Sequence, residues 1–143
     1  MANRMYKKGL TFGVFDLLHT GHINLLQRAR GLCDYLIVGV QEDEGVEKMK
    51  PRPILTTRER VELVESLHIA DKVVTYFESV DSTPFKRLEF DVYIHGDDWA
   101  EQTDRSEVLK YFDSKNIKLE LLPRTPGLST SDIIFRIKSA DLS

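Results

Sequence analysis

The chain has 143 residues, 41% of them hydrophobic, so it can bury one compact core, and we predict a single domain over residues 1–143. Its formal net charge of −3 argues against a general affinity for nucleic acid or anionic membranes, so any phosphate chemistry must rest on a local site. A single cysteine, Cys33, and no long apolar stretch near the basic N-terminus lead us to expect a cytoplasmic protein without membrane insertion.

Five apolar runs of strand length alternate with helical patterns. The runs cover residues 9–15, 34–40, 71–77, 90–96 and 117–123, and the first, second and fourth are almost continuously apolar. Continuous apolar strands are typical of a parallel sheet that is covered on both faces. Right-handed crossovers between such strands predict a Rossmann-like, doubly wound, five-stranded parallel sheet in a three-layer α/β/α fold.

Five helices are expected in strict alternation with these strands. The first follows segment 13–22, with apolar residues at helical spacing from Ile23 to Leu32. The second begins at Thr56, which can form a capping box with Glu59. The others begin at Pro84, cover residues 105–116, and begin near Ser129. The charged connection over residues 41–57 is long for such a fold, and long loops are often functional.

Segment 13–22, GVFDLLHTGH, leads from the first strand into the first helix. At that end of a parallel sheet, free backbone amides and the helix dipole favour phosphate binding. Gly13 permits a close approach of the ligand, and Gly21 leaves the helix start open. His19 and His22 share one face of the helix and can contact the same phosphoryl group.

Two alternatives for this histidine pair are a structural role and metal binding. A zinc protease motif would require a glutamate where Thr20 stands. Neither the dinucleotide pattern G-x-G-x-x-G nor a P-loop follows the first strand. The segment therefore predicts a phosphate site of a different type.

Three motifs resemble those of one known family. His19-Thr20-Gly21-His22 resembles the H-x-G-H signature of the nucleotidyltransferase superfamily. RTPGLSTSDI, residues 124–133, resembles the R-T-x-G-I-S-T-[ST]-x-I motif of cytidylyltransferases, with Leu128 in place of the usual isoleucine. GDDW at residues 96–99 lies between them in the expected order. The chain resembles the bacterial glycerol-3-phosphate cytidylyltransferases, with the ethanolamine-phosphate and choline-phosphate enzymes as further relatives.

This resemblance implies transfer of CMP from CTP to a phosphorylated alcohol, such as glycerol 3-phosphate, giving a CDP-alcohol and pyrophosphate. It also implies Mg²⁺ bound with the triphosphate and a homodimer. No protein metal cage is visible in the sequence. Two alternatives stay open: an adenylyltransferase of the same superfamily, similar to FAD synthetases, and a regulatory protein that binds nucleotide without turnover.

The resemblance assigns residues to roles. The expected catalytic residues are His19, His22, Lys50 and Arg124. Lys50 lies ten residues before Arg60, the spacing that separates the important lysine from the helix arginine in the choline-phosphate and ethanolamine-phosphate enzymes. The expected acceptor-binding residues are Asp16, Lys48 and Arg60. For Asp16, two alternatives stay open: it orients a nearby histidine, or it is a residue of the turn at the helix start. The expected nucleotide-binding residues are Gly13, Val14, Phe15, Gly21, Asp97, Asp98, Trp99, Thr125, Gly127, Ser129 and Thr130.

Some of these positions have competing explanations. Asp97 or Asp98 can read a cytosine amino group, and Trp99 either packs beside the base or is a structural tryptophan. Val14 stands where the family often has a threonine. His68 stands where glycerol-phosphate and choline-phosphate relatives tend to have an arginine, which bears on the acceptor or the subunit contact.

Overall fold

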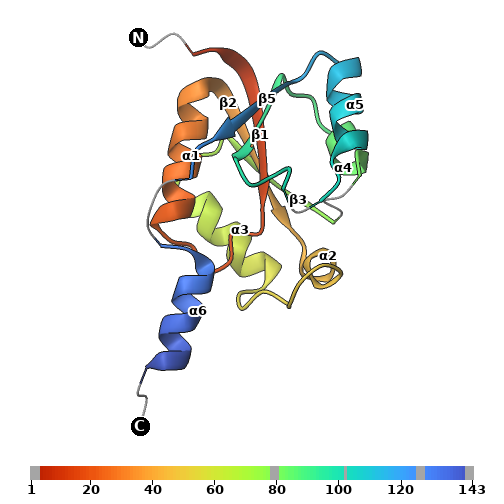
Figure 1. Cartoon of the computed structure of the whole chain (residues 1–143). Coiled ribbons are helices and arrows are strands. Elements are labelled where there is room, and N and C mark those ends of the chain that lie inside the picture. Colours follow the sequence, from red (N-terminus) through yellow and green to blue (C-terminus); the bar gives the residue numbers. More distant parts are fainter. Residues whose placement is uncertain (1–3, 78–80, 102, 125–127, 141–143) are drawn as a thin grey trace.

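A computed structural model describes residues 4–77, 81–101, 103–124 and 128–140. The elements are β1 (Tyr6–Gly13), α1 (Thr20–Leu32), β2 (Cys33–Gln41), α2 (Asp43–Glu47), α3 (Thr57–Ser66), β3 (Lys72–Tyr76), α4 (Thr83–Lys86), β4 (Val92–Gly96), α5 (Ser106–Ser114), β5 (Lys118–Leu122) and α6 (Thr130–Ser139). All five strands form one parallel sheet in the order β3-β2-β1-β4-β5 (Figure 1). The predicted Rossmann-like α/β fold is confirmed.

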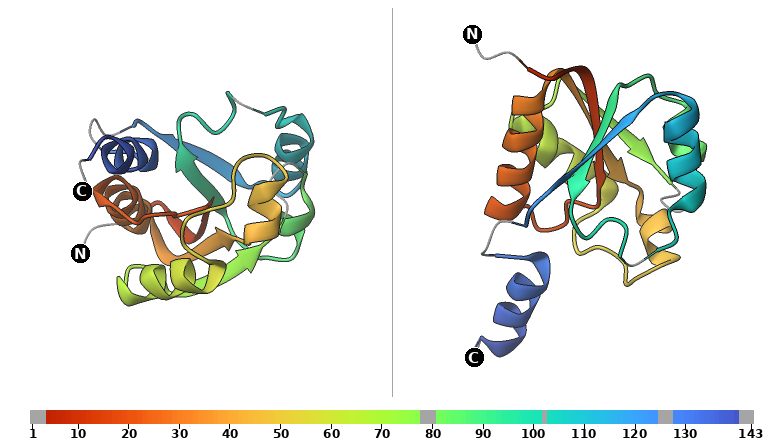
Figure 2. Two further views of the ribbon diagram at one scale, coloured as in Figure 1. Left: turned by 90° about the horizontal axis from the view of Figure 1, so that it is seen from below. Right: turned by 45° about the horizontal axis from the view of Figure 1, so that its top comes forward.

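The sheet has a hydrophobic core on each face. One core joins Leu10, Phe12 and Tyr93 of the sheet to Phe85 of α4 and Phe112 of α5. The opposite core joins strand residues such as Val38, Val40 and Val92 to α1 and α3, and it includes the buried Cys33. Helices therefore cover both faces, which explains why the central strands are apolar without alternation (Figures 1 and 2).

The direction of chain winding changes between β1 and β4. From β1 the chain moves outward through β2 to β3, and it then returns to pair β4 with the other side of β1. Ligands in open parallel sheets bind beyond the carboxyl ends of the strands at such a reversal. The loops that follow Gly13 of β1 and Gly96 of β4 therefore border the expected binding position.

Two of the expected helix starts are confirmed in atomic detail. Thr56 and Glu59 form the predicted capping box of α3, and Ser129 and Asp132 form one at α6. Strict alternation is wrong at one place, because α2 adds a second helix between β2 and β3. Its five residues are too few to show a helical period. At Gly45, an added Cβ would lie 2.1 Å from the Phe77 carbonyl oxygen, so close backbone packing determines this turn.

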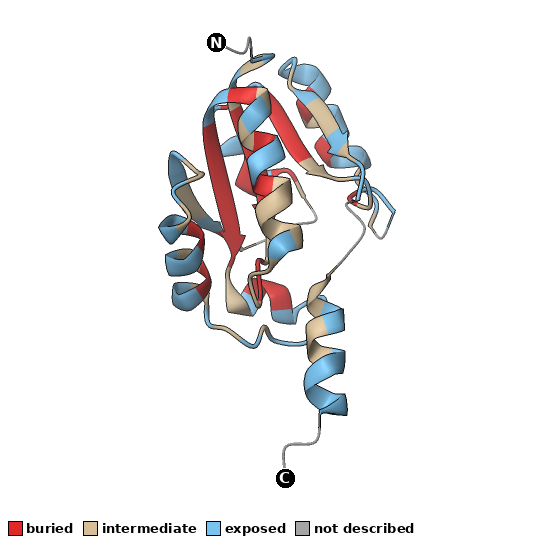
Figure 3. Cartoon of the chain, turned by 90° about the vertical axis from the view of Figure 1, so that its left-hand side faces the viewer, coloured by how far each residue is buried: buried red, intermediate tan, exposed pale blue. Residues whose placement is uncertain are grey.

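Helix α6 extends away from the body of the protein (Figures 1 and 3). None of its residues is buried, and Phe135 is 70% exposed. Its attachment to the sheet domain therefore depends on its first turn. Within the described part of the chain, no helix is long and apolar enough to cross a membrane.

The fully buried side chain of Arg60 connects the loops at the carboxyl edge of the sheet. Its guanidinium donates to Val14 O at 2.8 Å, Gln41 O at 2.6 Å, Leu55 O at 3.0 Å, Asp43 Oδ1 at 2.7 Å and Thr57 Oγ1 at 3.3 Å. Burial alone would raise the pKa of Asp43, but hydrogen bonds from Arg60 and Thr57 lower it below its usual value. The carboxylate is therefore ionised opposite the buried cation.

Replacing Arg60 with methionine should lower the free energy of unfolding by about 3–5 kcal/mol, because it leaves a carboxylate and several carbonyl groups without their buried donor. Urea denaturation at neutral pH measures this loss. Arg58→Met on the same helix is the matched control. Arg58 is 88% exposed and pairs with Glu62 in an exposed ion pair, so its loss should stay below about 0.5 kcal/mol. Equal losses in the two variants would contradict the role given to Arg60.

Candidate active site

The loop between β1 and α1 has an unusual backbone. Phe15 and Leu17 have φ angles of 55° and 49°, in the left-handed region that non-glycine residues rarely adopt. Each such residue costs on the order of 1–3 kcal/mol and persists only where its surroundings fix it. Phe15 is 3% exposed, and a Cβ at Gly13 would lie 2.9 Å from its ring. This loop is thus held in one conformation.

The two histidines cap helix α1. His19 is the N-cap residue, and its Nδ1 accepts a hydrogen bond from Gly21 N at 3.0 Å. His22 Nδ1 accepts in turn from His19 N at 3.2 Å. An Nδ1 that accepts carries no proton, so the proton of each neutral ring lies on Nε2. Both rings therefore have an Nε2–H donor that is not used by the cap, and their centroids are 3.9 Å apart.

Both imidazoles are neutral at physiological pH. The pKa of His22 is lowered to about 4: burial is the main cause, the nearby His19 adds to the shift, and Asp16 opposes it. Burial also lowers the pKa of His19, against the effect of Asp132. The pair therefore offers hydrogen-bond donors and carries no fixed positive charge.

The C-terminal motif meets the histidines across the fold. Thr130 Oγ1 donates to Asp16 O at 3.0 Å and lies 3.4 Å from His19 Nε2. Because His19 Nδ1 is the acceptor of the cap, its Nε2–H is the group that faces the threonine oxygen. The approach is close: a Cβ at Gly21 would lie 2.9 Å from Leu128 O. This contact explains why glycine stands at this position of the H-x-G-H motif, because a side chain there would collide with the backbone of Leu128.

The other predicted phosphate ligands near α6 are only partly described. Ser129 is the N-cap residue of α6. Arg124 is exposed and lies close enough to Asp132 to lower its pKa, although hydrogen bonds from Ser129 have the larger effect. Thr125 and Gly127 lie outside the described residues.

Two of the three predicted acceptor-binding residues are hydrogen-bonded to the protein itself. Arg60 is 0% exposed and fully engaged with the protein, so it cannot touch an acceptor. The Asp16 carboxylate accepts from the backbone amides of Ile54 and Leu55 at 2.8 and 2.9 Å. It anchors the loop over residues 48–56. Lys48 Nζ lies 4.7 Å from the Phe77 ring centroid in a cation–π contact.

Lys50 is exposed. It lies close enough to His95, the penultimate residue of β4, to contribute to the lowering of the pKa of that imidazole, although burial is the main cause. The loop over residues 48–56, which follows α2, therefore places the Lys50 ammonium group on the side of the end of β4.

The GDDW segment forms the turn after β4. Asp97 is exposed, and Asp98 Oδ1 lies 4.0 Å from His95 Nδ1. Trp99 is 4% exposed and stacks against Phe112 in the hydrophobic core. Trp99 is therefore a structural residue of the core. Because its indole ring is buried there, the ring is not available to stack on a base.

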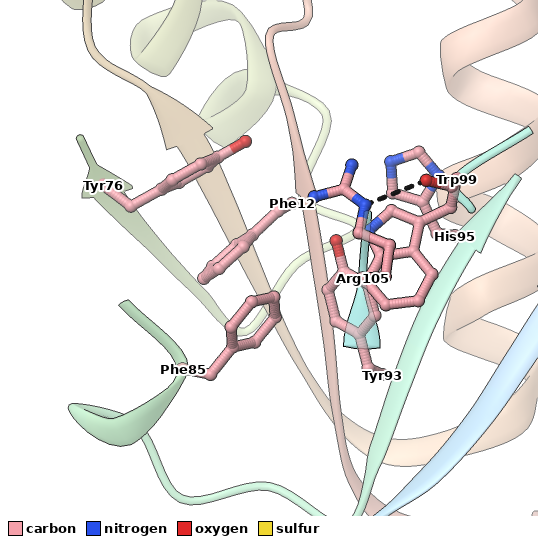
Figure 4. A pocket seen from close by; sticks show the side chains of 7 residues that line it. All are labelled: Phe12, Tyr76, Phe85, Tyr93, His95, Trp99 and Arg105. Atoms are coloured by element: carbon pink, nitrogen blue, oxygen red, sulfur yellow. Dashed lines mark hydrogen bonds between the residues drawn. The ribbon is translucent and has the colours of Figure 1, made fainter. Parts of the chain in front are cut away.

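A small cavity that the sequence did not predict lies beside this turn (Figure 4). Its volume is about 40 Å³, and it is lined by Phe12, Tyr76, Phe85, Tyr93, His95, Trp99 and Arg105. Burial lowers the pKa of His95 and raises that of Tyr93, so both side chains are uncharged at neutral pH. Arg105 Nε donates to Trp99 O at 3.0 Å, and the guanidinium lies over the Trp99 ring. His95, near the end of a buried strand, is the sequence feature that could have indicated a polar site here.

Across residues 4–77, 81–101, 103–124 and 128–140, no group of three or more His, Cys, Asp or Glu side chains is placed to hold a metal ion.

A family model described as cytidylyltransferase-like matches residues 10–136. The chain belongs to this family of nucleotidyltransferase domains. The bifunctional protein HldE of Caulobacter vibrioides is 37% identical over 139 residues, which cover 95% of this chain and 28% of that protein. The HldE protein of Citrifermentans bemidjiense is 36% identical over 141 residues, covering 96% of this chain and 28% of that protein. The chain thus spans little more than a quarter of the length of these curated relatives.

Solved structures share the fold. The lipopolysaccharide core biosynthesis protein from Thermoplasma volcanium superimposes with a TM-score of 0.69 over 84% of this chain and 97% of that one, at 24% identity. The pantoate-beta-alanine ligase from Francisella tularensis, complexed with beta-gamma ATP and beta-alanine, has a TM-score of 0.59 over 96% of this chain and 71% of that one, at 16% identity. Identities this low establish the fold alone.

Acid should destabilise the wild-type protein more than the His22→Asn variant. The pKa of His22 is about 4 in the folded state against its ordinary value of 6.5, so the unfolded chain takes up this proton first as the pH falls. The stability that neutral His22 contributes is complete above about pH 6.5 and is lost towards about pH 4. Urea denaturation at both ends of this range measures it. Identical losses in the two proteins would contradict the shifted pKa.

Proposed function

We propose that the chain transfers a nucleotidyl group from a nucleoside triphosphate to a phosphorylated acceptor, with release of pyrophosphate. One observation carries the proposal: His19 and His22 have Nε2–H donors at the point where the winding of the sheet reverses, and Thr130 of the C-terminal motif reaches the same place. Phosphate oxygens are the natural acceptors for such donors.

The chemistry requires no covalent enzyme intermediate. An oxygen of the acceptor phosphate attacks the α-phosphorus in line, the bond from that phosphorus to the β-phosphate oxygen breaks, and pyrophosphate leaves with the electron pair. The enzyme contributes positioning and charge stabilisation. The neutral histidines donate hydrogen bonds to the reacting phosphates, which needs no change of protonation state.

Two cations complete the proposed phosphate site. Lys50 bridges the acceptor phosphate and the α-phosphate, since a flexible ammonium group can follow a moving phosphoryl group. Arg124 and the first turn of α6 bind the outer phosphates. Magnesium enters as part of the substrate, as a complex with the triphosphate.

The proposed acceptor lies between Lys50 and the cavity. The acceptor phosphate contacts Lys50, and its other end faces His95 and the small polar pocket beside it. A cavity of about 40 Å³ suits a small end group. Glycerol 3-phosphate is the first acceptor that we propose to test, and the resemblance to cytidylyltransferases also leads us to propose a homodimer.

Two donors compete. The RTPGLST and GDDW motifs favour CTP, because they resemble those of cytidylyltransferases. ATP is the second candidate, as the donor of an adenylyltransferase of the same superfamily. A regulatory protein that binds nucleotide without turnover is a further alternative, against which the presence of His19, His22, Lys50 and Arg124 argues.

Pyrophosphate release should require one nucleotide and one class of acceptor. We expect release with CTP, magnesium and a phosphorylated alcohol, measured with CTP, ATP, GTP and UTP in separate reactions against a panel of phosphorylated alcohols and sugar phosphates. Release with ATP alone assigns the chain to the adenylyltransferases. Saturable nucleotide binding without release from any pair would favour the regulatory alternative and contradict the proposal.

His22→Asn should lower turnover by roughly a hundredfold or more, because it removes a preorganised donor to the reacting phosphates. Asparagine can still accept the cap hydrogen bond from His19 N, so the fold is expected to remain. Lys50→Ala should cause a similar loss. The matched control is Lys72→Ala, an exposed lysine at the start of β3, which should keep nearly full activity. Equal losses for Lys50→Ala and Lys72→Ala would argue against the site.

A further inference from the structure

We infer that Asp16 is a positioning residue that sets the place of Lys50 by anchoring the loop over residues 48–56. The inference rests on the proposed function, because it gives Lys50 a task in the transfer. It replaces acceptor binding as the role of Asp16.

The anchor is a pair of hydrogen bonds to consecutive amides. Asp16 Oδ2 accepts from Ile54 N at 2.8 Å, and Oδ1 accepts from Leu55 N at 2.9 Å. Asp16 is 8% exposed, so both oxygens are largely shielded from water. Hydrogen bonds to an ionised acceptor are about twice as strong as neutral ones. Two of them fix both the position and the direction of this backbone.

The segment between the anchor and Lys50 is stiff. Pro51 and Pro53 separate Lys50 from Ile54, and proline restricts both its own φ and the residue before it. Between the prolines, Arg52 pairs with Glu47 and Asp43. On the far side of the anchor, Leu55 O accepts from Arg60 Nε at 3.0 Å. The loop is therefore short and stiff. It is fixed at Ile54 and Leu55, and Lys50 lies towards its other end.

The backbone carbonyl of Asp16 is linked to His19 through Thr130. Its carbonyl oxygen accepts from Thr130 Oγ1 at 3.0 Å, and that hydroxyl lies 3.4 Å from His19 Nε2. The left-handed φ angles of Phe15 and Leu17 on either side set the orientation of Asp16. Asp16 thus fixes the position of the loop that carries Lys50 relative to that of the histidine pair. In-line transfer needs this relation, since a misplacement of 1 Å can cost roughly a hundredfold in rate.

Asp16→Asn is the informative variant, because asparagine can accept only one of the two amide hydrogen bonds. Its control is Glu59→Gln. Glu59 Oε1 accepts from Thr56 N at 2.9 Å, so it makes the same kind of bond to the next amide along the chain but on the exposed, helix side of the loop. This control should leave the conformation of the loop over residues 48–56 unchanged.

The first measurement is amide hydrogen exchange at Ile54 and Leu55, which needs no enzymatic activity. We expect at least roughly tenfold faster exchange in Asp16→Asn and unchanged exchange in Glu59→Gln, with the amides of β2 protected as in the wild type. Unchanged exchange at both residues in Asp16→Asn would overturn the anchoring role.

The second measurement is a double-mutant cycle between Asp16→Asn and Lys50→Ala, read as kcat/KM for pyrophosphate release. In the wild-type background Asp16→Asn should cost roughly a hundredfold, and in the Lys50→Ala background less than roughly threefold. Equal costs in the two backgrounds would overturn the inference, because Asp16 would then act independently of the lysine. A wild-type protein without turnover on any substrate would instead refute the proposed function, and the exchange experiment would still decide whether Asp16 orders the loop.

Discussion

The buried guanidinium of Arg60 is the constraint on which the rest of the site depends. It joins the loop after β1, the end of β2, helix α2 and the loop over residues 48–56 through donors that share one rigid plane. A buried ion pair is weak evidence for stability in itself. Here its value is geometric, because each acceptor belongs to a different segment and a shorter or more flexible cation could not reach them all.

The histidines show how a helix start can also organise a phosphate site. A serine or aspartate at the N-cap would stabilise α1 equally well. With imidazoles in both positions of the capping box, the backbone amides occupy Nδ1 and leave Nε2–H for another partner. Burial then keeps both rings neutral. The hydrogen bonds of the cap therefore determine which ring atom meets a ligand.

Much of this arrangement could be predicted from the sequence. Continuous apolar strands indicated the parallel sheet, and the Thr56 and Ser129 caps are local patterns that need no distant partner. Helix α2 escaped prediction because it is short and is held by contact with Phe77. The resemblance gave Arg60 an acceptor-binding role that its full burial excludes, because a sequence motif does not reveal burial. The choice between structure and base stacking at Trp99 likewise depended on Phe112, which lies across the core. The cavity arises from four separate parts of the chain and has no sequence pattern of its own.

The central claim is that two neutral histidines offer Nε2–H donors to the phosphates of a nucleotide. Nitrogen-15 NMR of the imidazole rings at neutral pH, before and after addition of a non-hydrolysable triphosphate, tests it most directly. The account predicts that both rings carry their proton on Nε2 in the free protein, and that the nucleotide shifts the Nε2 resonances while both rings stay neutral. A proton on Nδ1 of either ring, or Nε2 resonances that do not respond to any nucleotide, would contradict it.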